Sequence, residues 1–170
     1  MTPMDDLDNY KLGETNELLR ATTREDCRLI ALAIASQAQH SLSILSHNME
    51  PDLYNTPSFY EAARDVLAAD SRSVIRILVS DVSRLVLNGH RLLDLSRRQS
   101  SRVQIRKLNN PIHHAFLVAD EIAVLDRRRA ERFEATANFN DQGWANNLLH
   151  FFNQTWERCS SSSELQTLSI

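Results

Sequence analysis

The chain is poor in the residues that break or cross-link a fold. Its 170 residues include only three glycines, four prolines and two cysteines. So few glycines leave no glycine-rich loop of the kind that holds nucleotide phosphates, which argues against a nucleotide-triphosphate enzyme. Cys27 and Cys159 lie far apart and lack the paired spacing of a zinc site. We therefore expect two reduced thiols, no metal and no cofactor.

Long apolar stretches are missing as well. No run of eighteen apolar residues occurs, and the acidic first ten residues contain no apolar core of a signal peptide. We therefore expect a cytoplasmic protein without membrane insertion. A net charge of -3 gives no overall attraction to nucleic acid, but residues 84–132 carry eleven Lys and Arg against five Asp and Glu. The basic character is local.

The order of apolar patterns predicts an α/β protein with a mixed sheet flanked by helices. At 42% hydrophobic residues, the chain is long enough to bury one continuous core. Helices alternate with strands in the first half and strands cluster in the second, so the early strands should be parallel. We expect an arm over residues 1–21, a domain over 22–158 and a tail over 159–170. One helix is predicted to start at Thr22, with Glu25 completing a capping box, and another at Pro57 after a cap at Asn55 or Thr56. Two more helices are predicted over 83–98, with a weak point at Gly89, and over 141–159. Strands are predicted near 41–46, 73–81, 102–108, 114–120, 121–126 and 132–139.

Polar residues follow the strand period in two of these segments. In NPIHHAFLVAD, His113 and Ala115 should face one side of the sheet, and His114 and Asp120 the other. In RFEATANF, the face that carries Thr136 also carries Glu134 and Asn138. A polar face on an inner strand costs free energy unless it is hydrogen-bonded or lines a cleft.

This arrangement resembles the phospholipase D superfamily, whose motif is His, any residue, Lys, any four residues and Asp, followed by Gly-Ser and an Asn two beyond the Ser. His113 and Asp120 match the first and last positions, and Thr136 and Asn138 stand for the later Ser and Asn. The resemblance covers most of the chain from residue 41 and is greatest with a small bacterial group without an assigned activity. It implies the fold of one phospholipase D half-domain.

The departures from the motif bear on catalysis. Ala115 replaces the lysine that would hold a phosphate, Ala135 replaces the glycine, and only one motif copy is present. The resemblance implies a histidine nucleophile that needs no metal, and a homodimer to bring two copies of His113 together. The developing charge also needs fixed cations. Arg127, Arg128 and Arg129 would supply them if their turn folds over the cleft; the alternative is a solvated hairpin tip.

Each candidate residue also has a structural interpretation. His113 is either a nucleophile or phosphate ligand, or a strand-start histidine bonded to a backbone carbonyl, while His114 is interpreted as structural. Asp120 either orients an imidazole or serves a turn. Thr136 and Asn138 either contact a ligand or form a network that fixes the cleft wall.

Three functional hypotheses follow. The favoured one is a non-catalytic phospholipase D-like domain, a pseudo-enzyme that binds a phosphate-bearing small molecule, a nucleic acid or another macromolecule, as a homodimer. The first alternative is a metal-independent phosphodiesterase or nuclease in which His113 is the nucleophile. The second is a scaffold that retains only the fold and uses its basic segment for a protein partner. Fold alone does not choose among them.

Overall fold

The structure, a computed structural model, describes residues 3–159 and residue 165, and it confirms the predicted α/β class. One mixed sheet of seven strands has the order β1-β7-β6-β5-β2-β3-β4. Strands β2, β3 and β4 are parallel, and the remaining neighbours are antiparallel. The strands are β1 Leu19–Ala21, β2 Ser41–Ser46, β3 Val74–Val79, β4 Val103–Lys107, β5 Ala115–Ala119, β6 Ala123–Arg127 and β7 Ala135–Asn138; the helices are the 3-10 helix η1 Pro3–Asn9, α1 Arg24–Gln37, α2 Pro51–Tyr54, α3 Pro57–Ala69, α4 Ser83–Asn88, α5 Arg91–Arg98 and α6 Gln142–Arg158.

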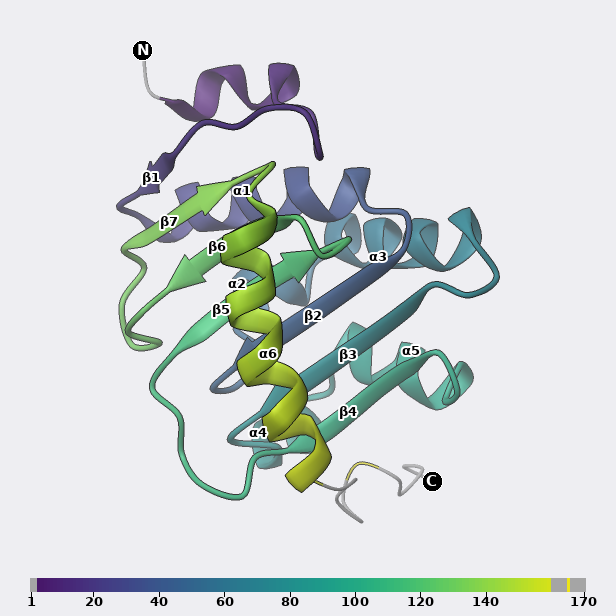
Figure 1. Cartoon of the computed structure of the whole chain (residues 1–170). Coiled ribbons are helices and arrows are strands. Elements are labelled where there is room, and N and C mark those ends of the chain that lie inside the picture. Colours follow the sequence, from purple (N-terminus) through teal and green to yellow (C-terminus); the bar gives the residue numbers. More distant parts are fainter. Residues whose placement is uncertain (1–2, 160–164, 166–170) are drawn as a thin grey trace.

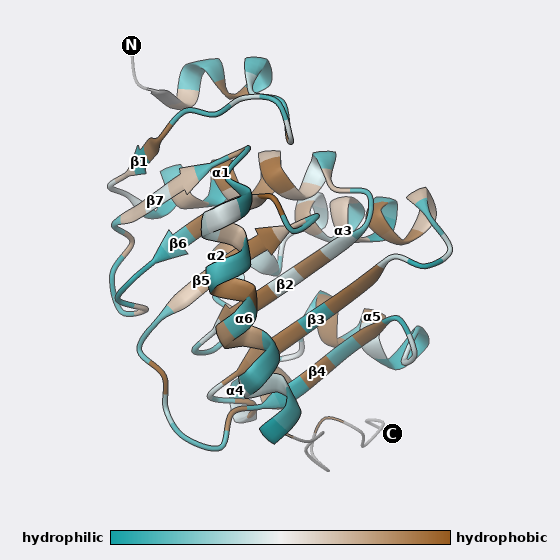
Figure 2. Ribbon diagram, viewed as in Figure 1, coloured by the Kyte–Doolittle hydropathy of each residue, from teal (hydrophilic) through white to brown (hydrophobic). Residues whose placement is uncertain are grey.

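Helices cover the two faces of the sheet unequally. Figure 1 shows α6 alone in front of the sheet, crossing its strands, with α1, α3 and α5 behind. The hydrophobic core is divided accordingly, and the strands that separate its two parts are largely apolar (Figure 2). Leu117 and Ala119 of β5 pack on the side of α1, while Phe116 and Val118 pack on the side of α6. Strand alternation therefore divides these four residues of β5 between the two cores.

The structure confirms the predicted start of α3 and the predicted weak point at Gly89, but it moves the predicted cap of α1. Helix α3 begins after Thr56, whose hydroxyl accepts the amide of Phe59 at 3.1 Å. Gly89, with φ of +76°, ends α4 and separates it from α5, as its weak point predicted. The predicted cap at Thr22 is wrong by one residue. Thr23 caps α1 by accepting the amide of Asp26, while the Asp26 carboxylate accepts the amide of Thr22.

The segment expected as an N-terminal arm has defined structure where it is described. Its strand β1 pairs with β7, and the Gly13 amide donates to the carbonyl of Phe139 at 2.8 Å. The Gln37 side chain of α1 holds the arm by accepting the Leu12 amide and donating to the Tyr10 carbonyl, each at 2.8 Å. The arm thus adds an edge strand next to β7.

Most of the expected tail over 159–170 lies outside the described residues. Of the two tail residues that are described, Cys159 follows the end of α6 and is buried. Leu165 is buried in the core on the α1 side, and its carbonyl accepts a hydrogen bond from the Arg97 side chain at 3.4 Å. None of the described helices has both the length and the apolar character that a membrane-spanning helix requires.

Candidate functional site

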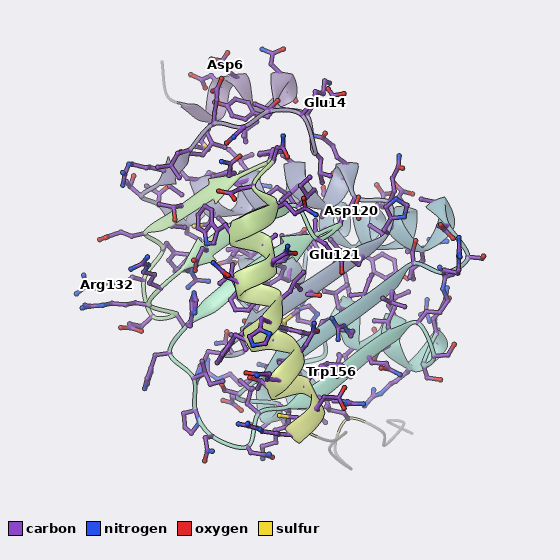
Figure 3. The ribbon with its side chains drawn as sticks, viewed as in Figure 1. Asp6, Glu14, Asp120, Glu121, Arg132 and Trp156 are labelled. Atoms are coloured by element: carbon purple, nitrogen blue, oxygen red, sulfur yellow. The ribbon has the colours of Figure 1, made fainter. Side chains whose placement is uncertain are left out.

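The two ends of the predicted motif lie at opposite ends of strand β5, which is the central strand of the sheet. His113 precedes β5, and Asp120 follows it, so roughly 20 Å of extended chain separates them. The Asp120 carboxylate, labelled in Figure 3, accepts the backbone amides of Gln39, His40 and Ser41 at 2.9, 2.7 and 3.0 Å. This corrects one of the two roles proposed for Asp120. Within one chain it cannot orient the imidazole of His113, and it instead fixes the start of β2.

The carboxylate that does orient a histidine is Asp126, on the neighbouring strand β6. Its Oδ1 accepts a hydrogen bond from Nε2 of His114, and its Oδ2 accepts the indole N–H of Trp144 at 3.2 Å. Asp126 is 5% exposed, so its charge is satisfied by these two donors in a largely water-free position. His114 is partly exposed and packs edge-on against Phe116. The histidine interpreted as structural is therefore the one held by a carboxylate.

His113 itself is exposed at the entry to β5. Its carbonyl accepts the amide of Ala130 at 2.6 Å, and its ring has no hydrogen bond to any residue that the structure describes. Ala115, at the position of the motif lysine, is buried. Because this position is an alanine, the motif strand places no cationic side chain beside His113.

The two polar residues of β7 have different surroundings. The side-chain nitrogen of Asn138 donates to Oδ1 of Asn16 in the arm at 2.8 Å, and its Oδ1 accepts the backbone amide of Asn140 at 3.0 Å. Asn138 is therefore engaged in a structural network. Thr136 is half-buried and pairs in register with Asp126 on one side and Arg20 on the other. Because directly paired residues project to the same face, Asp126, Thr136 and Arg20 form one row across the sheet.

That row borders a surface hollow of about 700 Å³, which we call the arginine hollow. Four exposed arginines line it, and none forms an ion pair with another residue in the described part of the chain. Figure 3 shows one of them, Arg132, at the end of the sheet away from Asp120 and Glu121. The residues that line the hollow are Arg20, Ala21, Thr22, Asp126, Arg128, Arg129, Arg132, Glu134, Ala135 and Thr136.

The structure separates Arg127 from its two neighbours and so corrects the expectation of one exposed arginine run. Arg127 is 2% exposed and lies on the opposite face of β6, because successive side chains alternate. Its Nη1 lies 3.0 Å from Oε2 of Glu50, its Nε donates to the carbonyl of Arg132 at 2.9 Å, and its guanidinium lies over the ring of Phe133. It cannot reach a ligand in the arginine hollow. Arg128 and Arg129 remain candidates.

Cys27 lies in the same buried region as Arg127. Burial raises the pKa of its thiol to about 11, with Arg127 opposing the shift, and the thiol donates to the carbonyl of Phe133. A thiol with so high a pKa is a poor nucleophile at neutral pH. Among the described residues, no group of three or more His, Cys, Asp and Glu is arranged to hold a metal ion.

Arg20, Arg132 and Asp126 were not selected as candidates from the sequence, and His114 was interpreted as structural. A weak signal for Asp126 was present, since it is the charged residue that ends the apolar run Ala123 to Leu125. The strand period could not place it beside Thr136, because the two residues lie on different strands whose register is set only in the sheet. Nothing local in the sequence indicates that Arg20 pairs with Thr136.

The sequence profile of the family described as "Domain of unknown function (DUF7931)" matches residues 23–168. The chain belongs to this family. No curated protein sequence is detectably similar to it.

Solved structures show what fold this DUF7931 chain has. It is similar to Nuc, a phospholipase D family member from Salmonella typhimurium, with 15% identity and a TM-score of 0.60 over 86% of this chain and 97% of that one. It is also similar to the archaeal chromatin protein TrmBL2, with 16% identity and a TM-score of 0.62 over 85% of this chain and 53% of that one. A third similar structure is phosphatidylserine synthase from Haemophilus influenzae, with 14% identity and a TM-score of 0.61 over 91% and 41% of the two chains.

The predicted phospholipase D-like fold is thereby confirmed. The chain spans about half the length of TrmBL2 and nearly the whole of Nuc. At these identities the likeness concerns the fold alone.

Proposed function

We propose that this protein is a non-catalytic phospholipase D-like domain that binds a phosphate-bearing ligand in the arginine hollow. The observation that carries the proposal is the set of four exposed arginines around one concave surface, none of them ion-paired with a residue that the structure describes. Arginine presents a planar set of donors that matches phosphate oxygens in two parallel hydrogen bonds. The Thr136 hydroxyl adds a neutral donor to the lining of the same hollow.

The balance of charge in the hollow also supports an anionic ligand. Against four arginines stand Asp126 and Glu134, and Asp126 is already occupied by His114 and Trp144. The similarity to a chromatin protein with its own mode of DNA binding and to a phosphatidylserine synthase fits a ligand that contains phosphate. A homodimer and a cytoplasmic location are part of the proposal as well.

Replacing Arg128 and Arg129 together by alanine should weaken binding of inorganic pyrophosphate by about tenfold or more, because each charge-assisted hydrogen bond contributes roughly 1.5–3 kcal/mol. Isothermal titration calorimetry measures this directly. The matched control is the Arg72→Ala, Arg84→Ala double variant, which removes two exposed charges outside the hollow. Equal affinities for both double variants, or no binding by the wild type, would refute the arginine hollow and favour the scaffold hypothesis.

We expect no phosphodiester turnover above background with bis-p-nitrophenyl phosphate in EDTA. Buried Ala115 stands at the position of the motif lysine. Loss of a group that stabilises the charge of the transition state lowers rates by about a hundredfold to a thousandfold. His113→Ala and His114→Ala serve as controls. Turnover that disappears in either variant would contradict the proposal and support the phosphodiesterase alternative, with the sensitive variant identifying the histidine.

A further inference from the structure

Helix α6 carries few charges on its exposed surface. Over its first fifteen residues no charged side chain occurs, and only Glu157 and Arg158 follow at its end. Exposed helix faces in globular proteins are usually rich in charged residues. Here amide side chains occupy much of that surface, namely Gln142, Asn146, Asn147, Asn153 and Gln154.

One side of this helix adjoins the arginine hollow. Trp144, in the first turn, donates its indole N–H to Asp126, which lines the hollow. Residues three, four and seven positions apart lie on one side of a helix, so Trp144, Asn147 and Phe151 share a flank. Figure 1 shows α6 lying against the face of the sheet, with β7 and β1 beyond its first turns. We call Trp144, Asn147 and Phe151 the α6 flank.

Phe151 is unusual among the large apolar residues of α6. It is 39% exposed, whereas Leu148, Phe152 and Trp156 are buried against the sheet. Seven residues correspond to about 10 Å of helix, which equals about three stacked nucleotides at 3.4 Å each. The flank therefore offers an exposed aromatic ring and an amide on the same side of α6 as Trp144, which contacts Asp126 in the lining of the arginine hollow.

We propose that the ligand of the arginine hollow is a single-stranded nucleic acid, whose phosphates bind the arginines and whose bases contact the α6 flank. Aromatic rings stack on any unpaired base, and amide side chains hydrogen-bond to base edges. In a duplex the faces of the bases are already stacked and give Phe151 nothing to stack on. An isolated phosphate compound would make no use of the flank.

This inference rests on the proposed function, and its test keeps the two apart. Fluorescence anisotropy with a labelled twelve-nucleotide oligothymidine measures nucleic-acid binding, and calorimetry with pyrophosphate measures the hollow alone. Phe151→Ala should weaken oligothymidine binding by roughly tenfold and leave pyrophosphate affinity unchanged, because one lost stacking contact costs about 1–3 kcal/mol. The matched control is Leu87→Ala, which truncates an 84% exposed leucine on α4 and should change neither.

The alternative outcomes are distinct. If Phe151→Ala and Leu87→Ala bind oligothymidine equally, or if a duplex of the same length binds as tightly as the single strand, the inference is wrong. The proposed function stands in that case, provided that the Arg128, Arg129 double variant still loses pyrophosphate. If the wild type binds pyrophosphate and no oligothymidine, only the inference fails. If it binds neither, both fail.

Discussion

Arg127→Met is expected to lower the free energy of unfolding by about 3–5 kcal/mol, because it leaves the carboxylate of Glu50 buried without its countercharge. Glu50 is 9% exposed, and among the described residues its Oε2 atom has the charge of Arg127 at 3.0 Å and no hydrogen-bond donor. Its Oε1 accepts a long bond of 3.3 Å from Ser46. Methionine matches much of the arginine stem but carries no charge. Urea denaturation monitored by circular dichroism measures the change.

Two further variants show whether charge is the cause. Arg128→Met, one residue along the chain and exposed, should change the free energy of unfolding by no more than about 0.5 kcal/mol. The double variant Glu50→Met, Arg127→Met should recover much of the loss, because a buried ion pair is often replaceable by apolar residues. A loss in Arg127→Met no larger than that in Arg128→Met would show that the ion pair is not needed for the fold.

Stability should decrease by about 3 kcal/mol as the pH falls from 6.5 to 4, with His90 as the source. His90 is 3% exposed, and burial lowers the pKa of its imidazole from 6.5 to about 4. Its Nδ1 accepts the backbone amide of Leu92 at 3.1 Å and so caps the start of α5. Its Nε2 donates to the carbonyl of Met49 at 3.0 Å. Both contacts are made by the neutral ring.

The sign follows from proton binding in the two states. Between pH 6.5 and 4 the unfolded chain protonates His90 and the folded chain does not, so acid favours unfolding. The difference between the two pKa values, 6.5 and about 4, sets the size of the effect, because one pKa unit corresponds to about 1.4 kcal/mol. The pKa values of Asp70 and Asp81 are lowered in the fold, chiefly by hydrogen bonds from Arg72 and Ser83. Their contributions are lost mainly as the pH falls below about 4. The exposed Glu25, whose pKa the hydrogen bond from Arg28 lowers from 4.5, titrates at the acid end of this window and does so equally in a His90 variant.

His90→Asn provides the control for this pH dependence. Asparagine can still cap α5 but does not titrate, so the variant should be less stable at pH 7 and nearly independent of pH from 6.5 to 4. Urea midpoints measured at half-unit pH intervals give both values. A slope in His90→Asn equal to that of the wild type would assign the titration to other groups.

Local pattern was sufficient for the fold class and for most elements of this chain. The Val- and Ile-rich run of β3 and the cap at Thr56 act over a few residues, so sequence spacing reports them directly. The error at Thr22 has the same local scale, because two adjacent threonines compete for one capping position and the contact with Asp26 decides between them. Such errors do not move the site.

The site depended on contacts between residues far apart in the sequence. The spacing of His113 and Asp120 predicted a shared role. However, the five residues of β5 lie between them, so the two side chains are at opposite ends of this strand. The arginine hollow needs β1 beside β7, a pairing of residues more than one hundred positions apart. Likewise, the approach of α6 to β6 joins Trp144 to Asp126.

By itself the sequence determined the α/β class, the phospholipase D-like order of elements, the absence of the motif lysine and the local excess of arginine, because all of these are properties of neighbouring residues. Only the tertiary structure decided which arginines are available to a ligand. Strand alternation turns Arg127 into the core towards Glu50, and strand pairing brings Arg20 to the row of Thr136 and Asp126. Neither the face of a strand nor its partner can be read from a run of three identical residues, since both are set by the register of the whole sheet.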